Sequence, residues 1–299
     1  MSVLLSGDAL DLPARLARLP GHAKTRAALA YLDPPFNVGT AHGARRGKGA
    51  RATGEVAYVD AWGGLDGFLA MLGPRVAAAR ELLTPTGVLF LHLDHRTVHD
   101  AKVLADRIFG RPAFRGEIIW VPGNGARGAG VPVTHQTLLV YSRDASPRGD
   151  YTWNAKDPAL REPYAATSQA MHFTNVDEAG RRYRERVIGG KAYRYYADEG
   201  RIRGSVWDDL PAMAANTPLR KETTGYPTQK PLALLERIVR ATTAPGDVVL
   251  DPMCGSGTTL LAAARLGRRF VGNDASPLAI ETTRGRFVAA ALPDPWIES

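Results

Sequence analysis

The stretch Val248-Val249-Leu250-Asp251-Pro252-Met253-Cys254-Gly255-Ser256-Gly257-Thr258-Thr259 decides the predicted fold. Its apolar start, rich in β-branched residues, predicts a short buried parallel strand. The two glycines let the backbone turn sharply and approach a ligand without a Cβ in the way. The alanine-rich segment that follows predicts a helix. A strand, a glycine loop and a helix N-terminus in succession are typical of an α/β ligand-binding unit.

A tight turn without a ligand is the alternative, and the next strand counts against it. That strand, Arg269–Asp274, ends in a carboxylate placed to accept hydrogen bonds from ribose hydroxyls. The loop departs from the dinucleotide fingerprint because it lacks a third glycine and follows Asp251 directly. An acid there repels pyrophosphate and attracts a cation. S-adenosylmethionine, with a ribose, a positive centre and no phosphate, fits better than a dinucleotide.

Composition and charge restrict the class of protein. The chain has 299 residues, 44% of them hydrophobic, which suits one large α/β domain with an insertion or two smaller domains. A formal net charge of +8 favours a polyanionic partner, although a basic soluble protein would also show it. Cys254 is the only cysteine, so an intrachain disulfide and a cysteine zinc cluster are excluded. The sequence shows neither a membrane span nor a signal peptide, so we expect a cytoplasmic protein.

A second buried strand, Ala27–Leu32, leads into Asp33-Pro34-Pro35-Phe36. The two prolines fix the backbone and remove two amide donors, while their carbonyls remain free to accept. An acid, stiff carbonyl-bearing residues and an aromatic ring at a strand end predict a rigid acceptor pocket with a stacking face. Such a pocket suits a planar group that carries an amino donor. A plain turn after a strand is the alternative.

The residues after this pocket are basic. The loop 39–54 has five glycines and no acid, and we expect it to be mobile. Its position favours contact with a phosphate backbone, and a solvated loop is the alternative. The candidate DNA-binding residues here are Arg45, Arg46, Lys48 and Arg51.

The middle of the chain divides into predicted sheet elements and an insertion. Helices are expected over 65–83 and 98–109, and strands over 87–94, 117–120 and 137–141. Because His92 lies in a strand and His95 and His99 follow it, they need not share a face, and we predict no metal site. From 145 to about 220, arginines alternate with aromatic residues and periodicity is poor. We interpret this segment as a recognition insertion rather than a solvated decoration, with Arg181, Arg182 and Arg184 as candidate DNA contacts.

Taken together, these motifs resemble the β-group DNA amino-methyltransferases. Asp33-Pro34-Pro35-Phe36 resembles the catalytic motif of that family, and Gly7-Asp8-Ala9-Leu10 resembles its N-terminal segment. Its cofactor motifs are matched by Thr228-Gln229-Lys230-Pro231, by the glycine loop and by Asn273-Asp274. The order is also that of the group: catalytic motif, target-recognition region, cofactor loop.

The resemblance implies a doubly wound, mostly parallel α/β sheet with a circularly permuted motif order. It implies a catalytic half over 1–144, a target-recognition insertion over 145–220 and a cofactor-binding half over 221–299. The implied catalytic residues are Asp33, Pro34, Pro35 and Phe36. The implied S-adenosylmethionine contacts are Asp8, Ala9, Asp33, Thr228, Gln229, Lys230, Asp251, Cys254, Gly255, Ser256, Gly257, Thr258, Thr259 and Asp274.

The implied activity is methylation of the exocyclic N6 of an adenine flipped out of double-stranded DNA. Cytosine-N4 methylation uses the same pocket, and Asp33 as the first motif residue leans towards adenine within the family. Two alternatives of other classes are a nicotinamide-dependent oxidoreductase and a nucleic-acid-binding module with an inactive cofactor site. The missing third glycine counts against the first, and the intact Asp33, Asp251 and Asp274 count against the second. A cognate restriction endonuclease and a homodimer are hypotheses that the sequence leaves open.

Overall fold

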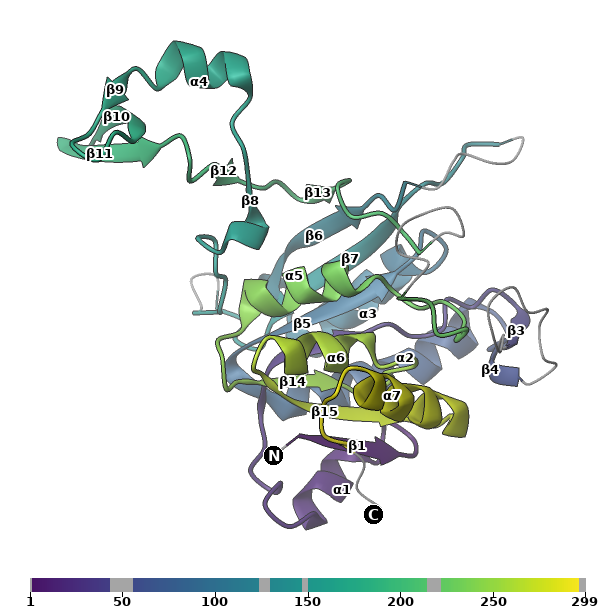
Figure 1. Ribbon diagram of the computed structural model, residues 1–299. Coiled ribbons are helices and arrows are strands. Elements are labelled where there is room, and N and C mark those ends of the chain that lie inside the picture. Colours follow the sequence, from purple (N-terminus) through teal and green to yellow (C-terminus); the bar gives the residue numbers. More distant parts are fainter. Residues whose placement is uncertain (1, 44–55, 124–129, 147–149, 214–221, 296–299) are drawn as a thin grey trace. The chain divides into compact units, whose positions relative to one another are not determined.

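A computed structural model describes residues 2–43, 56–123, 130–146, 150–213 and 222–295. The chain forms two compact units, one made of Met1–Trp153 with Ser205–Ser299 and the other of Asn154–Gly204. Figure 1 shows a large sheet with helices around it in the first unit. The second unit is described separately below.

The sheet of the first unit has eight strands. Their spatial order is β1 (Val3–Ser6), β15 (Arg269–Asp274), β14 (Val248–Asp251), β2 (Ala27–Leu32), β5 (Leu83–Leu93), β7 (Gln136–Ser142), β6 (Phe114–Trp120) and β13 (Val206–Trp207). The first five strands pair in parallel. Strand β7 runs antiparallel to both of its neighbours, and β13 is parallel to β6. This sheet confirms the predicted α/β class.

Helices cover both faces of the sheet, as a doubly wound fold requires. In Figure 1, α5 (Leu232–Thr242), α6 (Thr258–Arg265) and α7 (Pro277–Ala289) lie in front of the sheet. Helices α2 (Leu65–Leu82) and α3 (Val98–Phe109) lie behind it, and α1 (Leu12–Arg18) follows β1. Because of this double cover, every residue of β2 and β14 is buried. None of the helices in the described part of the chain is long and apolar enough to span a membrane.

The two ends of the chain meet in one sheet, as the permuted motif order predicts. Strand β1 pairs in parallel with β15, so that Ser6 stands opposite Asp274. The amide of Gly7 donates to the carbonyl of Asp274 at 2.9 Å, and the Asn273 side chain donates to the carbonyl of Gly7 at 2.8 Å. The N-terminal segment is therefore fixed beside the cofactor strands.

A small antiparallel hairpin follows the predicted catalytic motif. It consists of β3 (Thr40–Gly43) and β4 (Val56–Asp60). The predicted basic contacts Arg45, Arg46, Lys48 and Arg51 fall between these strands, outside the described residues. Their role in binding DNA stays a prediction.

The second compact unit spans Asn154–Gly204, a narrower range than the expected insertion over 145–220. Val206 and Trp207, inside the expected range, instead form β13 of the large sheet, where Trp207 is 1% exposed. The unit contains a three-stranded sheet and a two-stranded sheet. Its elements are a 3-10 turn at Pro158–Leu160, β8 (Arg161–Glu162), α4 (Ala166–His172), β9 (Asn175–Val176), β10 (Arg182–Ile188), β11 (Lys191–Tyr196) and β12 (Arg201–Ile202). Another 3-10 turn, Arg111–Ala113, belongs to the first unit.

Candidate active site

A cavity of about 760 Å³ opens at the carboxyl ends of the parallel strands. In open α/β sheets this is the edge where ligands bind. Four neighbouring strands each bring an aspartate to it: Asp8 follows β1, Asp274 ends β15, Asp251 ends β14 and Asp33 follows β2. The motifs separated by more than 200 residues of sequence therefore line one cavity.

Three of these carboxyls, Asp33, Asp251 and Asp274, have a raised pKa, so a nearby positive charge would stabilise their ionised forms. Burial raises the pKa of Asp251 to about 7; hydrogen bonds from Thr259 and the Met253 amide oppose the shift, while the charges of Asp33 and Asp274 add to it. Burial also raises the pKa of Asp33 and of Asp274. A cationic ligand would favour the ionised form of all three carboxyls. The site therefore fits a ligand with a positive centre, such as the sulfonium and amino groups of S-adenosylmethionine.

Asp33 is held by an ion pair from the other half of the sequence. The Lys230 ammonium donates to Asp33 Oδ2, and its charge lowers the pKa of Asp33 against the larger effect of burial. The same Lys230 Nζ lies 5.0 Å from the centre of the Phe36 ring. Asp33 Oδ1 is buried and has no hydrogen-bond partner among the described residues. Lys230 thus pairs with one carboxylate oxygen, while the other has no described partner.

Asp274 organises the glycine loop. Its Oδ2 accepts from the Gly255 amide at 2.8 Å, and its Oδ1 accepts from the Ser276 amide at 2.9 Å. Gly255 has φ +51°, and a Cβ on it would stand 3.2 Å from the Tyr226 ring. Each oxygen of Asp274 can accept a second hydrogen bond, so the predicted ribose contact remains compatible with this arrangement.

Gly257 has a packing role at the start of α6. It is not among the described residues that line the cavity, and it caps α6 at φ +71°. A Cβ there would stand 2.4 Å from Thr283 Oγ1 on α7. Gly257 therefore permits close packing of α6 against α7, and a direct cofactor contact stays untested.

The other predicted cofactor residues line the cavity, several of them with partners inside the protein. They are Asp8, Ala9, Thr228, Gln229, Lys230, Cys254, Ser256, Thr258 and Thr259. Both carboxylate oxygens of Asp8 accept from Nη2 of Arg75 on α2, at 2.8 and 2.7 Å. Gln229 Oε1 accepts from the Thr224 amide and hydroxyl, and its Nε2 donates to the Glu222 carbonyl at 2.8 Å. Both ends of the Gln229 amide therefore form hydrogen bonds that fix the conformation of its own loop.

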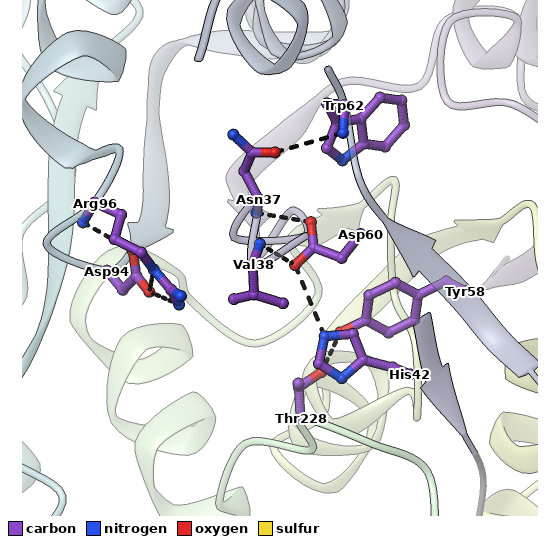
Figure 2. A network of polar contacts seen from close by, with 9 residues as sticks. All are labelled: Asn37, Val38, His42, Tyr58, Asp60, Trp62, Asp94, Arg96 and Thr228. Carbon is purple, nitrogen blue, oxygen red and sulfur yellow. Dashed lines mark hydrogen bonds and ion pairs between the residues drawn. The ribbon is translucent and has the colours of Figure 1, made fainter. Parts of the chain in front are cut away.

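Asp60, which the sequence did not single out, fixes the turn that follows Phe36. Its carboxylate is 1% exposed and accepts from the amides of Asn37 at 2.7 Å and Val38 at 3.2 Å (Figure 2). Asn37 has φ +58°, and its side chain accepts from the Trp62 amide at 3.4 Å. A carboxylate that binds two successive amides resists rotation of the turn. Asp60 therefore stabilises the conformation in which Phe36 lines the cavity.

The same hairpin also touches the Thr228-Gln229-Lys230-Pro231 segment. Tyr58 of β4 shares a hydrogen bond of 3.1 Å with Thr228 Oγ1, and its ring stacks on His42 with centres 4.8 Å apart (Figure 2). Thr228 has φ +56°, an uncommon conformation for a β-branched residue. Strand β4 thus contacts both the turn after Phe36 and the loop that supplies Lys230.

Other functional neighbours were also missed at the sequence level. His92 is completely buried, and its Nδ1 lies 2.7 Å from the Tyr31 hydroxyl. Burial and the charge of Lys230 lower its pKa well below the ordinary value, so it is neutral. Arg286 of α7 donates to the Ser256 carbonyl at 2.8 Å and to Thr258 Oγ1 at 2.7 Å. Only the tertiary structure brings His92 next to Phe36 and Arg286 to the glycine loop, since no motif spacing marks either residue.

The predicted DNA contacts Arg181, Arg182 and Arg184 lie in the second unit, where each has an internal partner. Arg181 donates to both oxygens of Asp198 at 2.9 Å. The Nε of Arg182 donates to the Phe173 carbonyl at 3.0 Å. Arg184 lies 5.2 Å from the centre of the Phe173 ring. A role in DNA binding stays untested for all three.

Comparison with known proteins agrees with this geometry. Residues 27–284 match a family model described as DNA methylase of the N6/N4 methyltransferase type. The type II methyltransferase M.EcaI of Enterobacter cloacae is 28% identical over 90% of this chain and 66% of its own length. The DNA adenine methyltransferase YhdJ of Escherichia coli K12 is 27% identical over 90% of this chain and 76% of its own length. The chain thus spans about two thirds to three quarters of these relatives.

Solved structures share the fold. An M1.HpyAVI–SAM complex superposes with a TM-score of 0.58 at 19% identity, covering 96% of this chain and 99% of that chain. The PvuII DNA methyltransferase, titled as cytosine-N4-specific, superposes with a TM-score of 0.54 at 15% identity, covering 93% of this chain and 84% of that chain. At these identities the likeness shows the fold alone.

Asp60→Ala is expected to lower the free energy of unfolding by about 2–3 kcal/mol, because two amides lose a charged acceptor. Urea denaturation followed by circular dichroism measures the change. His42→Phe is the matched control: it keeps a ring beside Tyr58 but removes the imidazole that lies 3.8 Å from Asp60. It should cost less than about 1 kcal/mol, as a distant ion pair does. An Asp60→Ala protein as stable as the wild type would show that the turn does not depend on this carboxylate.

Proposed function

The chain belongs to the N6/N4 DNA methylase family, which uses S-adenosylmethionine, and from this premise we propose that it methylates the N6 amino group of adenine in double-stranded DNA. The observation that carries the proposal is the state of Asp33. One carboxylate oxygen is paired with Lys230, and the other is buried without a described partner beside Phe36. That second oxygen can accept a hydrogen bond from a substrate.

An exocyclic amino nitrogen is the donor that suits this site. Its lone pair is conjugated with the ring, so it must become tetrahedral and positively charged as it attacks. Asp33 Oδ1 and the carbonyl of Pro34 would accept its two N–H groups and stabilise the developing charge. S-adenosylmethionine, when bound, supplies the methyl group. The rigid Pro34-Pro35 backbone keeps both acceptors in place without rearrangement at the moment of reaction.

Phe36 and its neighbours would receive the base. The Phe36 ring lines the cavity and packs near Lys230 and the neutral His92, with 6.2 Å between the Phe36 and His92 ring centres. A base inside a duplex cannot reach a cavity at the edge of a sheet, so it must flip out of the stack. Stacking on an aromatic ring offsets part of the cost of unstacking the base.

Adenine rather than cytosine is the finer part of the proposal. Asp33, as the first residue of its motif, leans towards adenine, and the similar protein YhdJ is named a DNA adenine methyltransferase. The PvuII enzyme, titled as cytosine-N4-specific, has the same fold, so the fold alone does not discriminate between the two bases. Both reactions use an amino nitrogen and the same pair of acceptors.

The biological setting is also part of the proposal. The similar proteins M.EcaI and M2.DpnII are named type II methyltransferases, and M2.DpnII is 41% identical over 33% of this chain. These names support a restriction-modification role. A cognate endonuclease, a homodimer and a cytoplasmic location stay predictions.

The modified base tests the proposal directly. Duplex DNA incubated with the protein and methyl-labelled S-adenosylmethionine, then digested to nucleosides, is expected to yield N6-methyl-2′-deoxyadenosine by mass spectrometry. N4-methyl-2′-deoxycytidine would overturn the adenine assignment, and no label in DNA would overturn the proposed activity. Asp33→Asn is the matched control because it keeps the size but replaces a charged acceptor with a neutral amide. It should lose about a hundred- to a thousandfold in single-turnover rate, while calorimetry shows S-adenosylmethionine still bound.

Removing Lys230 should shift the pH dependence of the reaction. Asp33 must be ionised to stabilise a growing positive charge, so activity falls as the pH drops through its pKa. Lys230 lowers that pKa, and Lys230→Met should therefore move the acid limb of kcat/KM to higher pH. Lys230→Arg, which keeps the positive charge, should restore the limb towards its original position. An acid limb that does not move in Lys230→Met would show that the lysine does not control Asp33.

A further inference from the structure

The second compact unit carries a strongly basic ribbon. Residues 181–196, which contain β10, the turn and β11, include six basic residues and one acid, a net charge of +5. Positive charge of this density in sixteen residues fits a polyanion. The distribution of this charge over the two faces of the ribbon shows which part of it is available.

The register of the hairpin assigns each side chain to a face. Arg186 stands opposite Tyr193, and Ile188 stands opposite Lys191. Side chains two residues apart share a face of a strand, so these four form one face at the end of the ribbon. We call it the tip face.

The opposite face is electrically satisfied. There Glu185 stands opposite Arg194, whose Nε donates to the Glu185 carboxylate at 3.4 Å. The Arg194 guanidinium also lies 4.8 Å from the centre of the Tyr183 ring. Towards the base of the ribbon, on the same face as Arg186, Arg184 is held among the rings of Tyr164, Phe173 and Tyr195, at 5.2 to 5.5 Å from their centres. Arg184 and Arg194 are therefore held by contacts within the unit.

The tip face is exposed and its charges are free of ion pairs with other described residues. Tyr193 is 42% and Ile188 56% exposed, and Arg186 and Lys191 are exposed as well. The Lys191 ammonium lies 5.8 Å from the centre of the Tyr193 ring and has no described carboxylate partner. Two exposed cations beside two exposed apolar side chains do not stabilise the folded unit, so they are free to contact a partner.

The end of the ribbon is also narrow. Its turn is Gly189-Gly190, with φ of +58° and +76°, the two-residue turn that matches the twist of a hairpin. Because neither residue has a side chain, the ribbon ends in bare backbone flanked by the tip face. A two-stranded ribbon of this kind fits the major groove of B-DNA, about 12 Å wide.

We propose that the β10–β11 ribbon enters the major groove of double-stranded DNA and reads bases through Arg186, Ile188, Lys191 and Tyr193. The proposal rests on the proposed DNA methyltransferase activity and assigns the reading of bases to residues other than Arg181, Arg182 and Arg184, the DNA contacts predicted from the sequence. Arginine and lysine donate to the acceptors of guanine in that groove, and an aliphatic side chain contacts the methyl group of thymine. Arg184, on the same side of the ribbon, stiffens its base.

The test compares two double substitutions of equal charge within the same unit. The tip variant is Arg186→Ala with Lys191→Ala, and the control is Arg194→Ala with Lys156→Ala, two basic residues that lie off the tip face. Fluorescence anisotropy with a duplex that the wild type methylates gives affinity as a function of salt. The tip variant should lower the slope of log affinity against log salt by up to about two, roughly one unit for each cation removed from the DNA, and the control should lower it by less.

Sequence preference separates reading from simple attraction. Methylated sites in genomic DNA are sequenced for the wild type, for Arg186→Lys, for Ile188→Ala with Tyr193→Ala, and for the control variant. Arg186→Lys keeps the charge but loses the two-point fit to guanine, so discrimination at one base position should fall about 5- to 150-fold. The apolar pair should relax preference at a neighbouring position. S-adenosylmethionine affinity and the thermal unfolding temperature should stay unchanged in all variants.

Three outcomes would overturn the proposal. Equal salt slopes for the tip and control variants would show only general attraction by the unit. A lower slope with unchanged site preference in every variant would show that the ribbon holds the backbone without reading bases. If site preference changes equally in the control, the reading surface lies elsewhere. Absence of methylation by the wild type would instead contradict the proposed function and is detected before any variant is compared.

Discussion

The ion pair between Asp33 and Lys230 is the interaction on which the site depends. The two residues are 197 positions apart, and they meet because α5, which begins just after Lys230, packs against β2, at whose end Asp33 lies. The contact is mostly buried, with 8% of the Lys230 and 19% of the Asp33 side chain exposed. Leaving either charge alone there would be costly, so the pair constrains how the Asp33-Pro34-Pro35-Phe36 turn and the Thr228-Gln229-Lys230-Pro231 loop can be placed.

The electrostatics of the rest of the cavity depend on four aspartates that lie close together. Parallel strands bring Asp8, Asp33, Asp251 and Asp274 to one edge, and each acid is handled differently. Arg75 neutralises Asp8, Lys230 pairs with Asp33, and two backbone amides bind Asp274. Asp251, with a pKa raised to about 7, has no basic side chain among its described hydrogen-bond partners. The charge that remains uncompensated favours a cationic ligand, in agreement with the family's use of S-adenosylmethionine.

Much of this could be predicted from the sequence, and the reason is local. The strand, glycine loop and helix around Asp251, and the Asp33-Pro34-Pro35-Phe36 turn, are short segments whose composition fixes their backbone. These segments predicted the α/β fold, the family and the cofactor, and the structure and the comparisons confirm all three. What escaped prediction depends on contacts distant in sequence: the amides held by Asp60, the partner of Lys230, the packing of Gly257 against Thr283. The arginines of β10 are the clearest example of this limit of prediction from sequence. The composition shows how many charges the strand carries, but not which of them have partners within the unit and which are exposed.

A double-mutant cycle on Asp33 and Lys230 tests the central claim most directly. Single-turnover methylation rates are measured for the wild type, Asp33→Asn, Lys230→Met and the double variant, at saturating S-adenosylmethionine and DNA. If Lys230 acts through the carboxylate, Lys230→Met should slow the wild type by about tenfold or more and should change Asp33→Asn little. If Lys230→Met slows both proteins by the same factor, the two residues act independently, and the ion pair is not what prepares Asp33 for the reaction.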